Sequence, residues 1–536
     1  MKNKIFILFL LIVSFGFIQC AKRGTPTGGE IDILPPEFLR ASPENYSTNF
    51  KADEVRIYFN EYVKLVKPQE QIIISPPITP RPEITPTGNP QKYVRININD
   101  TLQENTTYVI NFGNSIVDNN ESNPLPFFKY VFSTGSYIDS LTVSGTVNDA
   151  LLNEAEPFIS VMLYEINENF SDSLIYNEPP RYVTNTLDSL RTFELTNLKA
   201  GTYQMVAIKD LNNDYKYNPG KEKIAFINDP VTIPTDTTYN LTLFQENLAF
   251  QPERPKQLNR NKLLIGYRGS VNPDSIVFET LSTVPQDFDY RIVKVPEKDS
   301  LHFYYKPVLG ADTLKLRTVT PLRTDTIMTR IVDMPLDTLQ VTTEPSGNID
   351  FGGNIILRAN TPIISVNTDL ISVMDRDSTI INFTQELREF ENEVLLQFPK
   401  NENQSYSLNV LPGAITDFFG ATNDSISKIL KTRAFSEYGN LTLNLSNVRS
   451  FPIIVQLTDD KGVVKAEKYS TSTTNLRFEY ITPGTYLIRL IYDENENRKW
   501  DTGDYLKKTS PEEIIYFPAE LDVRPNWDIT ETFTVY

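Results

Sequence analysis

A long internal repeat constrains the fold of this 536-residue chain more than any other feature. A Gly-Thr-Tyr strand start at Gly201 is followed by a loop rich in Asp and Asn that begins at Asp210, and the same pattern returns at Gly484 and Asp493. The spacing from Gly201 to Gly484 equals the spacing from Asp210 to Asp493. A weaker echo links residues 105–118 with residues 403–417. A repeat of this size predicts separate modules in the order A, B, C, A′, B′.

The local pattern is that of short strands. Residues 55–59 and 93–98 alternate apolar and polar side chains, which is typical of a strand with one buried face. Similar runs rich in Ile, Val, Tyr, Phe and Thr are separated by clusters of Pro, Gly, Asn and Asp, and helical periodicity is scarce. The 36 prolines and 11% aromatic residues suit frequent turns and aromatic cores. We therefore predict an all-β fold of tandem antiparallel β-sandwich domains.

The repeats and the proline-rich joints also predict where the domains begin and end. At roughly 100 to 150 residues per domain, the length allows four or five domains. The expected order is a leader at residues 1–19, a tether at 20–35, and domains at 36–136, 137–249, 250–340, 341–436 and 437–536.

Composition excludes several kinds of chemistry. Cys20 is the single cysteine, so the chain cannot form an internal disulfide or a zinc site built from cysteines. His302 is the single histidine, which excludes multi-histidine metal centres and leaves one residue for any histidine-dependent catalysis. The formal net charge of -17 argues against non-specific nucleic-acid binding, because phosphates need clustered Lys and Arg.

The first twenty residues predict where in the cell the protein is located. Lys2 and Lys4 precede an apolar run at residues 5–18, which is too short to span a bilayer stably and has the charge order of a secretory signal. Cys20 follows at once and resembles the lipidated first residue of a mature bacterial lipoprotein. Gln19 departs from the small residue usual before that cysteine. An ordinary signal peptide cut nearby and an uncleaved anchor are the alternatives.

Lipidation of Cys20 would place the protein on a membrane through several acyl chains. The glycine-rich residues after it read as a flexible tether. Residues 21–24 (Ala-Lys-Arg-Gly) lack the acidic run that resembles the surface-export signal of Bacteroidota lipoproteins, and no Asp follows Cys20 to resemble an inner-membrane retention signal. We therefore expect the outer membrane, with the periplasmic and cell-surface faces both open.

Two module families are suggested by motifs. Residues 42–45 (Ser-Pro-Glu-Asn), 57–61 (Ile-Tyr-Phe-Asn-Glu) and 131–135 (Val-Phe-Ser-Thr-Gly) resemble the bacterial Ig-like module of S-layer and other envelope proteins. Residues 138–245 contain Val-Ser-Gly-Thr-Val at 143–147 and Gly-Thr-Tyr at 201–203. They resemble the prealbumin-like or carboxypeptidase-regulatory-like β-sandwich, with the final domain as its second copy. The copy of the Ig-like module at 341–436 lacks the Phe-Asn-Glu motif. The whole arrangement is similar to Ig-like-domain lipoproteins of Bacteroidota, and neither module family implies catalysis.

The repeated loop is a candidate calcium site. Calcium takes six to eight oxygen ligands, which alternating Asx side chains and one backbone carbonyl can supply. The first loop offers the side chains of Asp210, Asn212, Asp214 and Asn218 and the carbonyl of Lys216. The second offers Asp493, Asn495, Asn497, Asp501 and Asp504 with the carbonyl of Lys499. The alternative is that these side chains only cap their own loop. A bound ion would act as a structural cofactor.

Other candidate residues are few. Trp500 and Trp527 are candidates for stacking on sugar rings, with Tyr217 equivalent to Trp500, and the alternative is that these rings fill a core. His302 lies in an alternating strand, which favours a surface or partly packed imidazole over a catalytic one. Among 68 acidic residues no pair stands out as the two carboxylates of a glycoside hydrolase.

The sequence therefore predicts a non-enzymatic envelope lipoprotein. In this hypothesis a rod of β-sandwiches, tethered by Cys20, presents loops and strand edges to another envelope protein such as an outer-membrane barrel complex. The alternative is a glycan-binding lipoprotein for polysaccharide capture. An enzyme remains the third hypothesis, and nucleic acid is not an expected partner.

Overall fold

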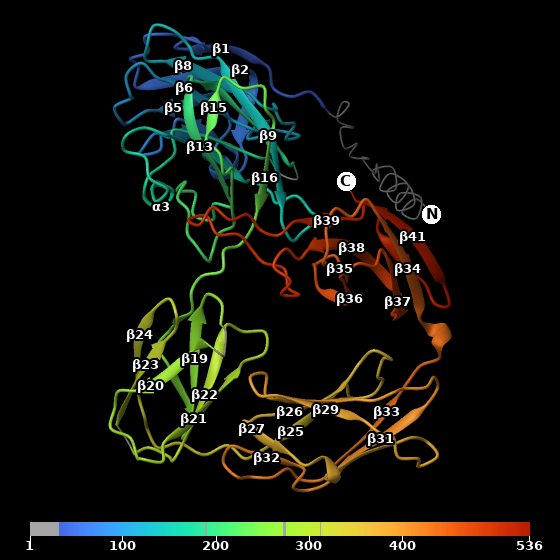
Figure 1. Cartoon of the computed structure of the whole chain (residues 1–536). Helices are drawn as coiled ribbons and strands as arrows, with labels where there is room; N and C mark the ends of the chain where they lie inside the picture. Colours follow the sequence, from blue (N-terminus) through green and yellow to red (C-terminus); the bar gives the residue numbers. More distant parts are fainter. Residues whose placement is uncertain (1–31, 188–189, 272–274, 311, 536) are drawn as a thin grey trace, which may run out of the picture. The chain divides into compact units, whose positions relative to one another are not determined.

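The computed structural model describes residues 32–187, 190–271, 275–310 and 312–535. Strands dominate both compact units of the chain, Met1–Asp139 and Ser140–Tyr536 (Figure 1), and the predicted all-β fold is confirmed. The helices of the described part are single turns: α2 (Pro68–Gln71), α3 (Leu174–Asn177), η2 (Thr368–Leu370) and η3 (Phe435–Glu437). Within the described ranges, no helix has the length and apolar character to cross a membrane.

The first unit is a sandwich of two sheets. One sheet has the order β1-β2-β5-β4, with β7 also pairing with β2, and the other has the order β3-β6-β8. The strands of the first sheet are β1 (Phe38–Ser42), β2 (Glu54–Leu65), β4 (Glu83–Thr85), β5 (Gln91–Asn97) and β7 (Ile116–Asp118). Those of the second are β3 (Ile73–Ser75), β6 (Thr107–Asn111) and β8 (Lys129–Ser133).

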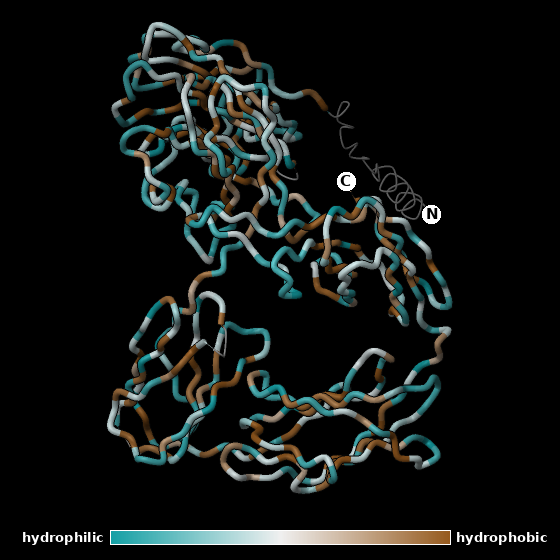
Figure 2. The backbone as a smooth tube through the Cα atoms, in the orientation of Figure 1, coloured by the Kyte–Doolittle hydropathy of each residue, from teal (hydrophilic) through white to brown (hydrophobic). Residues whose placement is uncertain are grey.

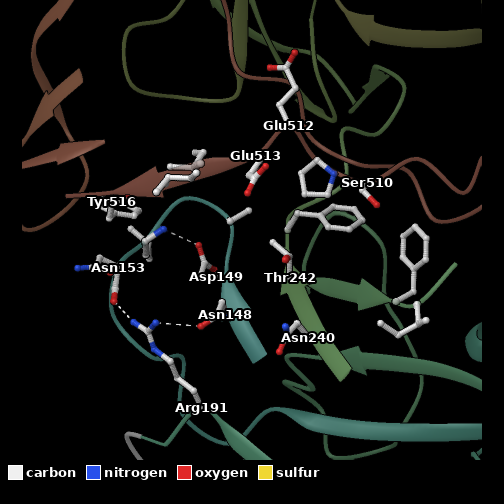
Figure 3. A pocket seen from close by; sticks show the side chains of 18 of the residues that line it. Asn148, Asp149, Asn153, Arg191, Asn240, Thr242, Ser510, Glu512, Glu513 and Tyr516 are labelled. Carbon is white, nitrogen blue, oxygen red and sulfur yellow. Dashed lines mark hydrogen bonds between the residues drawn. The ribbon is translucent and has the colours of Figure 1, made fainter. Parts of the chain in front are cut away.

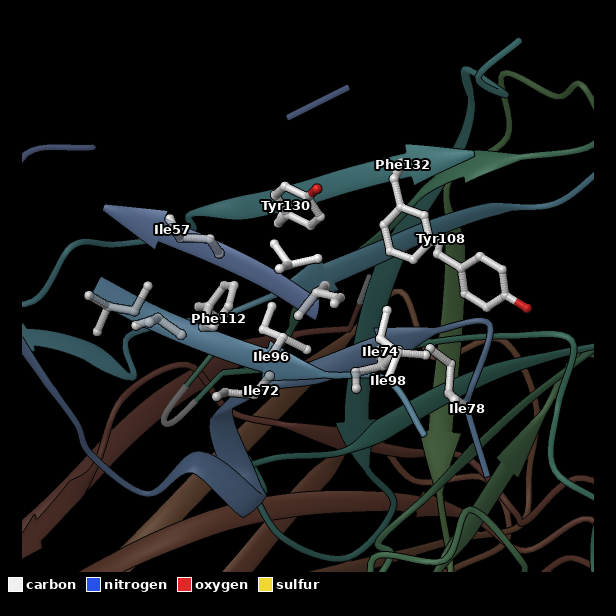
Figure 4. Packing of buried hydrophobic residues seen from close by; sticks show 14 of the residues in the cluster. Ile57, Ile72, Ile74, Ile78, Ile96, Ile98, Tyr108, Phe112, Tyr130 and Phe132 are labelled. Carbon is white, nitrogen blue, oxygen red and sulfur yellow. The ribbon is translucent and has the colours of Figure 1, made fainter. Parts of the chain in front are cut away.

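Alternation along the strands builds the core of this sandwich. Val55, Ile57 and Phe59 of β2 are buried, whereas the residues between them are partly exposed. The core packs branched aliphatic side chains around aromatic rings (Figure 4), and the Phe132 ring lies 4.0 Å from the Phe50 ring. Hydrophobic and hydrophilic residues are interleaved along the strands of both units (Figure 2), as expected for sheets with one wet face.

The second unit begins with a sandwich of residues 141–243. Its sheets have the orders β12-β9-β16 and β11-β10-β13-β14, with β15 pairing with β13. The β16 strand runs parallel to β9, and the other pairs are antiparallel. The strands are β9 (Leu141–Asp149), β10 (Ser160–Glu165), β11 (Tyr182–Asn185), β12 (Thr192–Leu198), β13 (Gly201–Ile208), β14 (Ile224–Phe226), β15 (Val231–Ile233) and β16 (Tyr239–Leu243).

The last sandwich repeats this topology strand for strand. Its sheets have the orders β37-β34-β41 and β36-β35-β38-β39, β40 pairs with β38, and β41 runs parallel to β34. The strands are β34 (Gly439–Ser446), β35 (Ile453–Thr458), β36 (Val464–Ser470), β37 (Asn475–Ile481), β38 (Gly484–Tyr492), β39 (Ile514–Tyr516), β40 (Leu521–Val523) and β41 (Asp528–Thr534). The Gly-Thr-Tyr repeat thus begins equivalent strands, β13 and β38.

A smaller sandwich follows the first copy. It pairs the sheet β17-β19-β22-β21, extended by β18, with the sheet β20-β23-β24. The strands are β17 (Gln251–Pro252), β18 (Lys256–Asn259), β19 (Lys262–Arg268), β20 (Val277–Thr280), β21 (Asp289–Lys294), β22 (Ser300–Lys306), β23 (Thr313–Val319) and β24 (Thr324–Arg330).

The remaining sandwich repeats the strand order of the first unit. Its sheets are β25-β26-β30-β29, β27-β32 and β28-β31-β33, so β26 and β27 together take the place of the long β2. The strands are β25 (Val341–Glu344), β26 (Ile355–Ala359), β27 (Ile363–Val366), β28 (Ile371–Met374), β29 (Thr384–Arg388), β30 (Glu393–Gln397), β31 (Ser405–Val410), β32 (Ile415–Asp417) and β33 (Ile426–Lys431). Asp118 and Asp417 end equivalent strands, and each accepts backbone N–H groups of the following turn.

Candidate functional site

The first repeated loop is held by two carboxylates. Asp210 follows β13 and accepts the N–H groups of Asn212 (3.1 Å) and Tyr215 (2.8 Å). Glu222 is 1% exposed and accepts the N–H groups of Leu211 (3.0 Å) and Asn218 (2.8 Å) from the other side of the loop. Burial raises the pKa of both carboxyl groups above the usual range.

The second repeated loop is also held by an aspartate and a glutamate that accept backbone N–H groups. Asp493 follows β38, is 1% exposed, and accepts the N–H groups of Asn497 (3.1 Å) and Arg498 (2.9 Å). Glu512 accepts the N–H groups of Glu494 (2.8 Å) and Asp501 (3.0 Å). The Asx turns considered as the alternative to calcium are therefore present in both loops.

The two glutamates that hold the loops, Glu222 and Glu512, do not align with each other at the constant offset of the sequence repeat. The stretch of chain from Asp493 to Glu512 is longer than the stretch from Asp210 to Glu222. The extra residues form the turn in which the Asp504 and Thr509 backbones pair. A search at the constant offset of the repeat misses this pair of glutamates, because the second loop carries the insertion.

In the second loop, some predicted calcium ligands hydrogen-bond to one another and another pairs with a lysine. Asn495 and Asn497 both donate side-chain N–H groups to Asp501, so these three side chains lie together. Asp504 pairs with Lys507 (2.7 Å). Over the described ranges, no cluster of three or more His, Cys, Asp or Glu residues is arranged to hold a metal ion. The calcium sites stay a prediction that depends on amide and carbonyl oxygens as well as carboxylates.

Chelation tests the calcium prediction directly. A site that binds calcium only in the folded state stabilises the protein by about 2.7 kcal/mol when free calcium is 100 times the Kd. We therefore expect EDTA to lower Tm and excess CaCl2 to restore it, with MgCl2 as the matched control. A Tm that neither addition changes contradicts both sites and leaves the Asx turns to hold the loops alone.

The second loop also contacts the sandwich of the first copy, within the same unit. Tyr505 is 0% exposed, its ring lies 5.2 Å from the Phe226 ring, and its N–H donates to Glu246 Oε1 (2.7 Å). Glu246 Oε2 accepts the hydroxyl of Tyr217 (2.9 Å), which belongs to the first loop. One carboxylate therefore connects the two repeated loops.

Further contacts surround Tyr505. Thr502 Oγ1 donates to the carbonyl of Gln245 (2.7 Å), and Lys508 Nζ lies 2.6 Å from Asp172 Oδ1. A Cβ atom added at Gly503 would lie 2.7 Å from the Phe244 ring, so the close approach requires glycine there. A linear rod of modules, as predicted, would keep the first and last sandwiches of this unit apart, so the rod is wrong for this part of the chain.

A polar groove of about 600 Å³ lies beside this contact (Figure 3). Arg191 is held across its floor by Asn148 Oδ1 (3.0 Å) and the carbonyl of Asn153. Arg489 Nη1 of the last sandwich donates to the carbonyl of Leu151 (2.9 Å), whose neighbours Ala150 and Leu152 line the groove. Other polar side chains that line the groove are those of Asp149, Asn228, Asn240, Thr242, Ser510, Glu512, Glu513 and Tyr516.

The two tryptophans have different environments. Trp500 is partly buried, and its indole N–H donates to the carbonyl of Glu512 (3.0 Å), so it helps to hold the second loop. Tyr217, its equivalent, is 1% exposed. Trp527 is 50% exposed, with the Arg524 guanidinium 4.9 Å from its ring. Tyr217 therefore fills a core, which was the alternative to sugar binding. Trp527 is the more exposed ring and the more accessible to a ligand.

His302 lies in β22 and is partly packed, in agreement with the prediction for this residue. Burial, aided by Lys262, lowers the pKa of its imidazole from 6.5 to about 4. The imidazole is therefore neutral at physiological pH, and it lies in a strand that carries neither repeated loop.

The titration of His302 can be measured without assignment, because it is the only histidine. NMR of protein labelled with ¹³C in the histidine ring should show one signal with a midpoint near pH 4. The unfolded chain binds this proton near pH 6.5, so His302 should lower stability progressively as the pH falls from 6.5 towards 4. His302→Gln should remove that part of the pH dependence. A midpoint at the unperturbed value of 6.5 would contradict the burial described here.

The predicted lipidation site, Cys20, lies outside the described residues, as do the predicted leader and most of the tether. Lipidation therefore stays a prediction from the sequence.

Comparison with known proteins identifies one domain. Residues 32–134 match the family of bacterial Ig-like domains, which confirms the first module resemblance. No match is found among curated proteins. The other predicted resemblances, to prealbumin-like domains and to Bacteroidota lipoproteins, stay predictions.

Solved structures resemble the chain only at low scores. A structure of the surface-layer protein SbsC (domains 1–6) is 10% identical with a TM-score of 0.14, covering 91% of this chain and 67% of that chain. The Bacteroides ovatus glucan-utilization protein SGBP-B, solved with a mixed-linkage heptasaccharide, is 11% identical with a TM-score of 0.17, covering 71% and 94%. The Escherichia coli adhesin FdeC is 8% identical with a TM-score of 0.15, covering 61% and 93%.

These scores carry no argument about function, and this chain spans about two thirds of the surface-layer chain. The family match and the sheet topology establish a tandem β-sandwich protein with a bacterial Ig-like domain at residues 32–134.

Proposed function

We propose that this protein is a non-enzymatic envelope lipoprotein whose β-sandwich modules bind another envelope protein. Cys20 is its lipid anchor and residues 20–35 are its tether. The outer membrane is the expected location, and a barrel complex of that membrane is the expected class of partner. The protein acts by presenting surfaces, not by turnover.

The observation that supports this proposal most strongly is the use of polar side chains at the repeated loops. Asp210, Glu222, Asp493 and Glu512 accept backbone N–H groups of their own loops. Glu246 joins Tyr217 to Tyr505. Carboxylates that accept backbone N–H groups in this way hold their loops in place. Rigid sandwiches that carry connecting loops are a common support for protein binding.

Affinity purification from native membranes tests the proposed partner. Full-length tagged protein, extracted in mild detergent, should co-purify with one integral outer-membrane protein at a constant ratio. The Cys20→Ser protein, which should not reach the membrane, is the matched control and should recover much less of it. Equal recovery by both proteins, or no partner at a constant ratio, would contradict the proposal.

The polar groove supports a second candidate function, the capture of a polysaccharide. Its amide, hydroxyl and guanidinium groups suit the hydroxyl groups of sugars, and the exposed Trp527 ring offers a separate stacking surface. A glycan array should then show binding that Arg191→Ala or Trp527→Ala reduces. Binding that neither substitution changes would exclude these two surfaces as its cause.

A further inference from the structure

The outward face of one sheet in the first unit carries a regular array of arginines and tyrosines. Strand pairing places Arg40 of β1 opposite Tyr58 of β2, and Tyr58 opposite Tyr93 of β5. Pairing also places Arg56 opposite Arg95 in the next row. The neighbouring residues of β2 and β5 are buried in the core, so these side chains face outward.

The Arg56–Arg95 pair is unfavourable for the sheet by itself. Like charges directly opposite each other on neighbouring strands repel and lower stability. Glu54 compensates Arg56, with the Arg56 Nε atom 2.6 Å from Glu54 Oε1. Neither Arg95 nor Arg40 forms an ion pair with another residue of the described part. Two uncompensated guanidinium groups on one face of a protein with a net charge of -17 indicate an anionic ligand.

The tyrosines add a second kind of contact. The rings of Tyr58 and Tyr93 lie 5.8 Å apart, and the Arg40 guanidinium carbon lies 4.0 Å from the centre of the Tyr58 ring. Stacking on tyrosine holds a guanidinium in place while its N–H groups stay open to solvent. The face therefore combines fixed donors for a carboxylate with aromatic rings that suit the flat side of a sugar.

The residues that border the array restrict the chemical class of ligand that it can bind. Ser42 and Thr85 extend the Arg56–Arg95 row at its two ends, and their hydroxyl groups suit sugar hydroxyls. Glu54 and Glu83 pair with Asn97 in the row beyond, so carboxylates border the arginines on that side. The two arginine and tyrosine rows contain no aliphatic side chain to insert into a bilayer, which disfavours a membrane surface as the occupant.

We propose that this sheet face binds an acidic polysaccharide. The carboxylate of a uronic acid residue lies on Arg95, which has no ion pair among the described residues, and the neighbouring sugar lies on the Tyr58–Tyr93 pair beside Arg40. The two rows run across neighbouring strands, so they suit a polymer better than a small molecule. This inference goes beyond the proposed scaffold role and does not depend on lipidation of Cys20 or on the groove of the second unit.

Binding to polygalacturonate tests the proposal. The full-length protein in detergent should bind polygalacturonate, should bind its carboxyl-reduced form much more weakly, and should lose affinity as salt is added. The double variant Arg40→Ala/Arg95→Ala should bind about tenfold to a hundredfold more weakly, because the two guanidinium groups without an internal ion pair are lost. Arg317→Ala is the control, since Arg317 is a strand arginine that already pairs with Glu279 (2.8 Å) and should not contribute to binding.

The double variant should fold, because Arg40 and Arg95 lie at the surface and the loss of Arg95 removes the repulsion from Arg56 opposite it. Absence of binding to polygalacturonate and to a second uronic acid polymer, alginate, would overturn the proposal. Equal binding of the carboxyl-reduced polymer, or equal binding by the double variant, would overturn it too. If the Cys20→Ser protein instead binds phosphatidylglycerol vesicles through Arg40 and Arg95 but binds neither polymer, the occupant is a membrane surface and the proposal is wrong.

Discussion

Replacing Tyr505 by alanine should open the contact between the first and last sandwiches of the second unit. Its ring is fully buried against Phe226, and its N–H group donates to Glu246. Removing a buried aromatic side chain costs about 3–5 kcal/mol, because the apolar contact is lost and a cavity is left. Such a cost corresponds to a weakening of the contact by roughly two to three and a half orders of magnitude. Hydrogen exchange of residues 498–512 and 244–246 should rise accordingly.

Two variants in the same turn separate this effect from a general change in the loop. Leu506 is adjacent and 60% exposed, so Leu506→Ala should leave hydrogen exchange nearly unchanged. Tyr505→Phe keeps the ring and loses only the hydroxyl, which lies 3.4 Å from Asp172 Oδ1, so its effect should be small. If Tyr505→Ala exchanges no faster than Leu506→Ala, the loop does not hold the two sandwiches together.

Replacing Cys20 by serine should move the protein from the membrane fraction to the soluble fraction almost completely. Each buried CH2 group contributes about 0.8 kcal/mol to membrane binding, so losing several acyl chains removes the anchor that we propose. The helices of the described residues offer no replacement for it. Cell fractionation followed by immunoblotting measures the change.

The control for this substitution lies a few residues downstream. Thr25→Ser changes the tether by one methyl group and keeps the cysteine, so this protein should stay with the membrane. Retention of the Cys20→Ser protein in membranes after a high-salt wash would mean that something other than a lipid on Cys20 holds it there.

Much of the fold follows from local patterns in the sequence. The alternation at residues 55–59 and 93–98 predicted the strands that became β2 and β5, because burying one face of a sheet imposes a period of two. The internal repeat predicted equivalent modules, and β9–β16 and β34–β41 share one topology. The echo between residues 105–118 and 403–417 likewise lies on equivalent strands.

Long-range features could not be predicted in this way. Nothing near Tyr505 in the sequence shows that its ring packs on Phe226, and the predicted linear rod failed for that reason. Glu512 could not be matched to Glu222 because the spacing within the two loops differs. The opposition of Arg56 and Arg95 depends on strand register, which includes an irregularity between Tyr58 and Val63. The sequence around each arginine does not show that the two residues lie opposite each other.

Mass spectrometry of the N-terminal peptide, from protein isolated from its native membranes, tests the central claim most directly. Our account predicts a mature chain that begins at Cys20 and carries acyl groups on its sulfur and its α-amino group. An unmodified Cys20 thiol, or a chain that still contains residues 1–19, would contradict it.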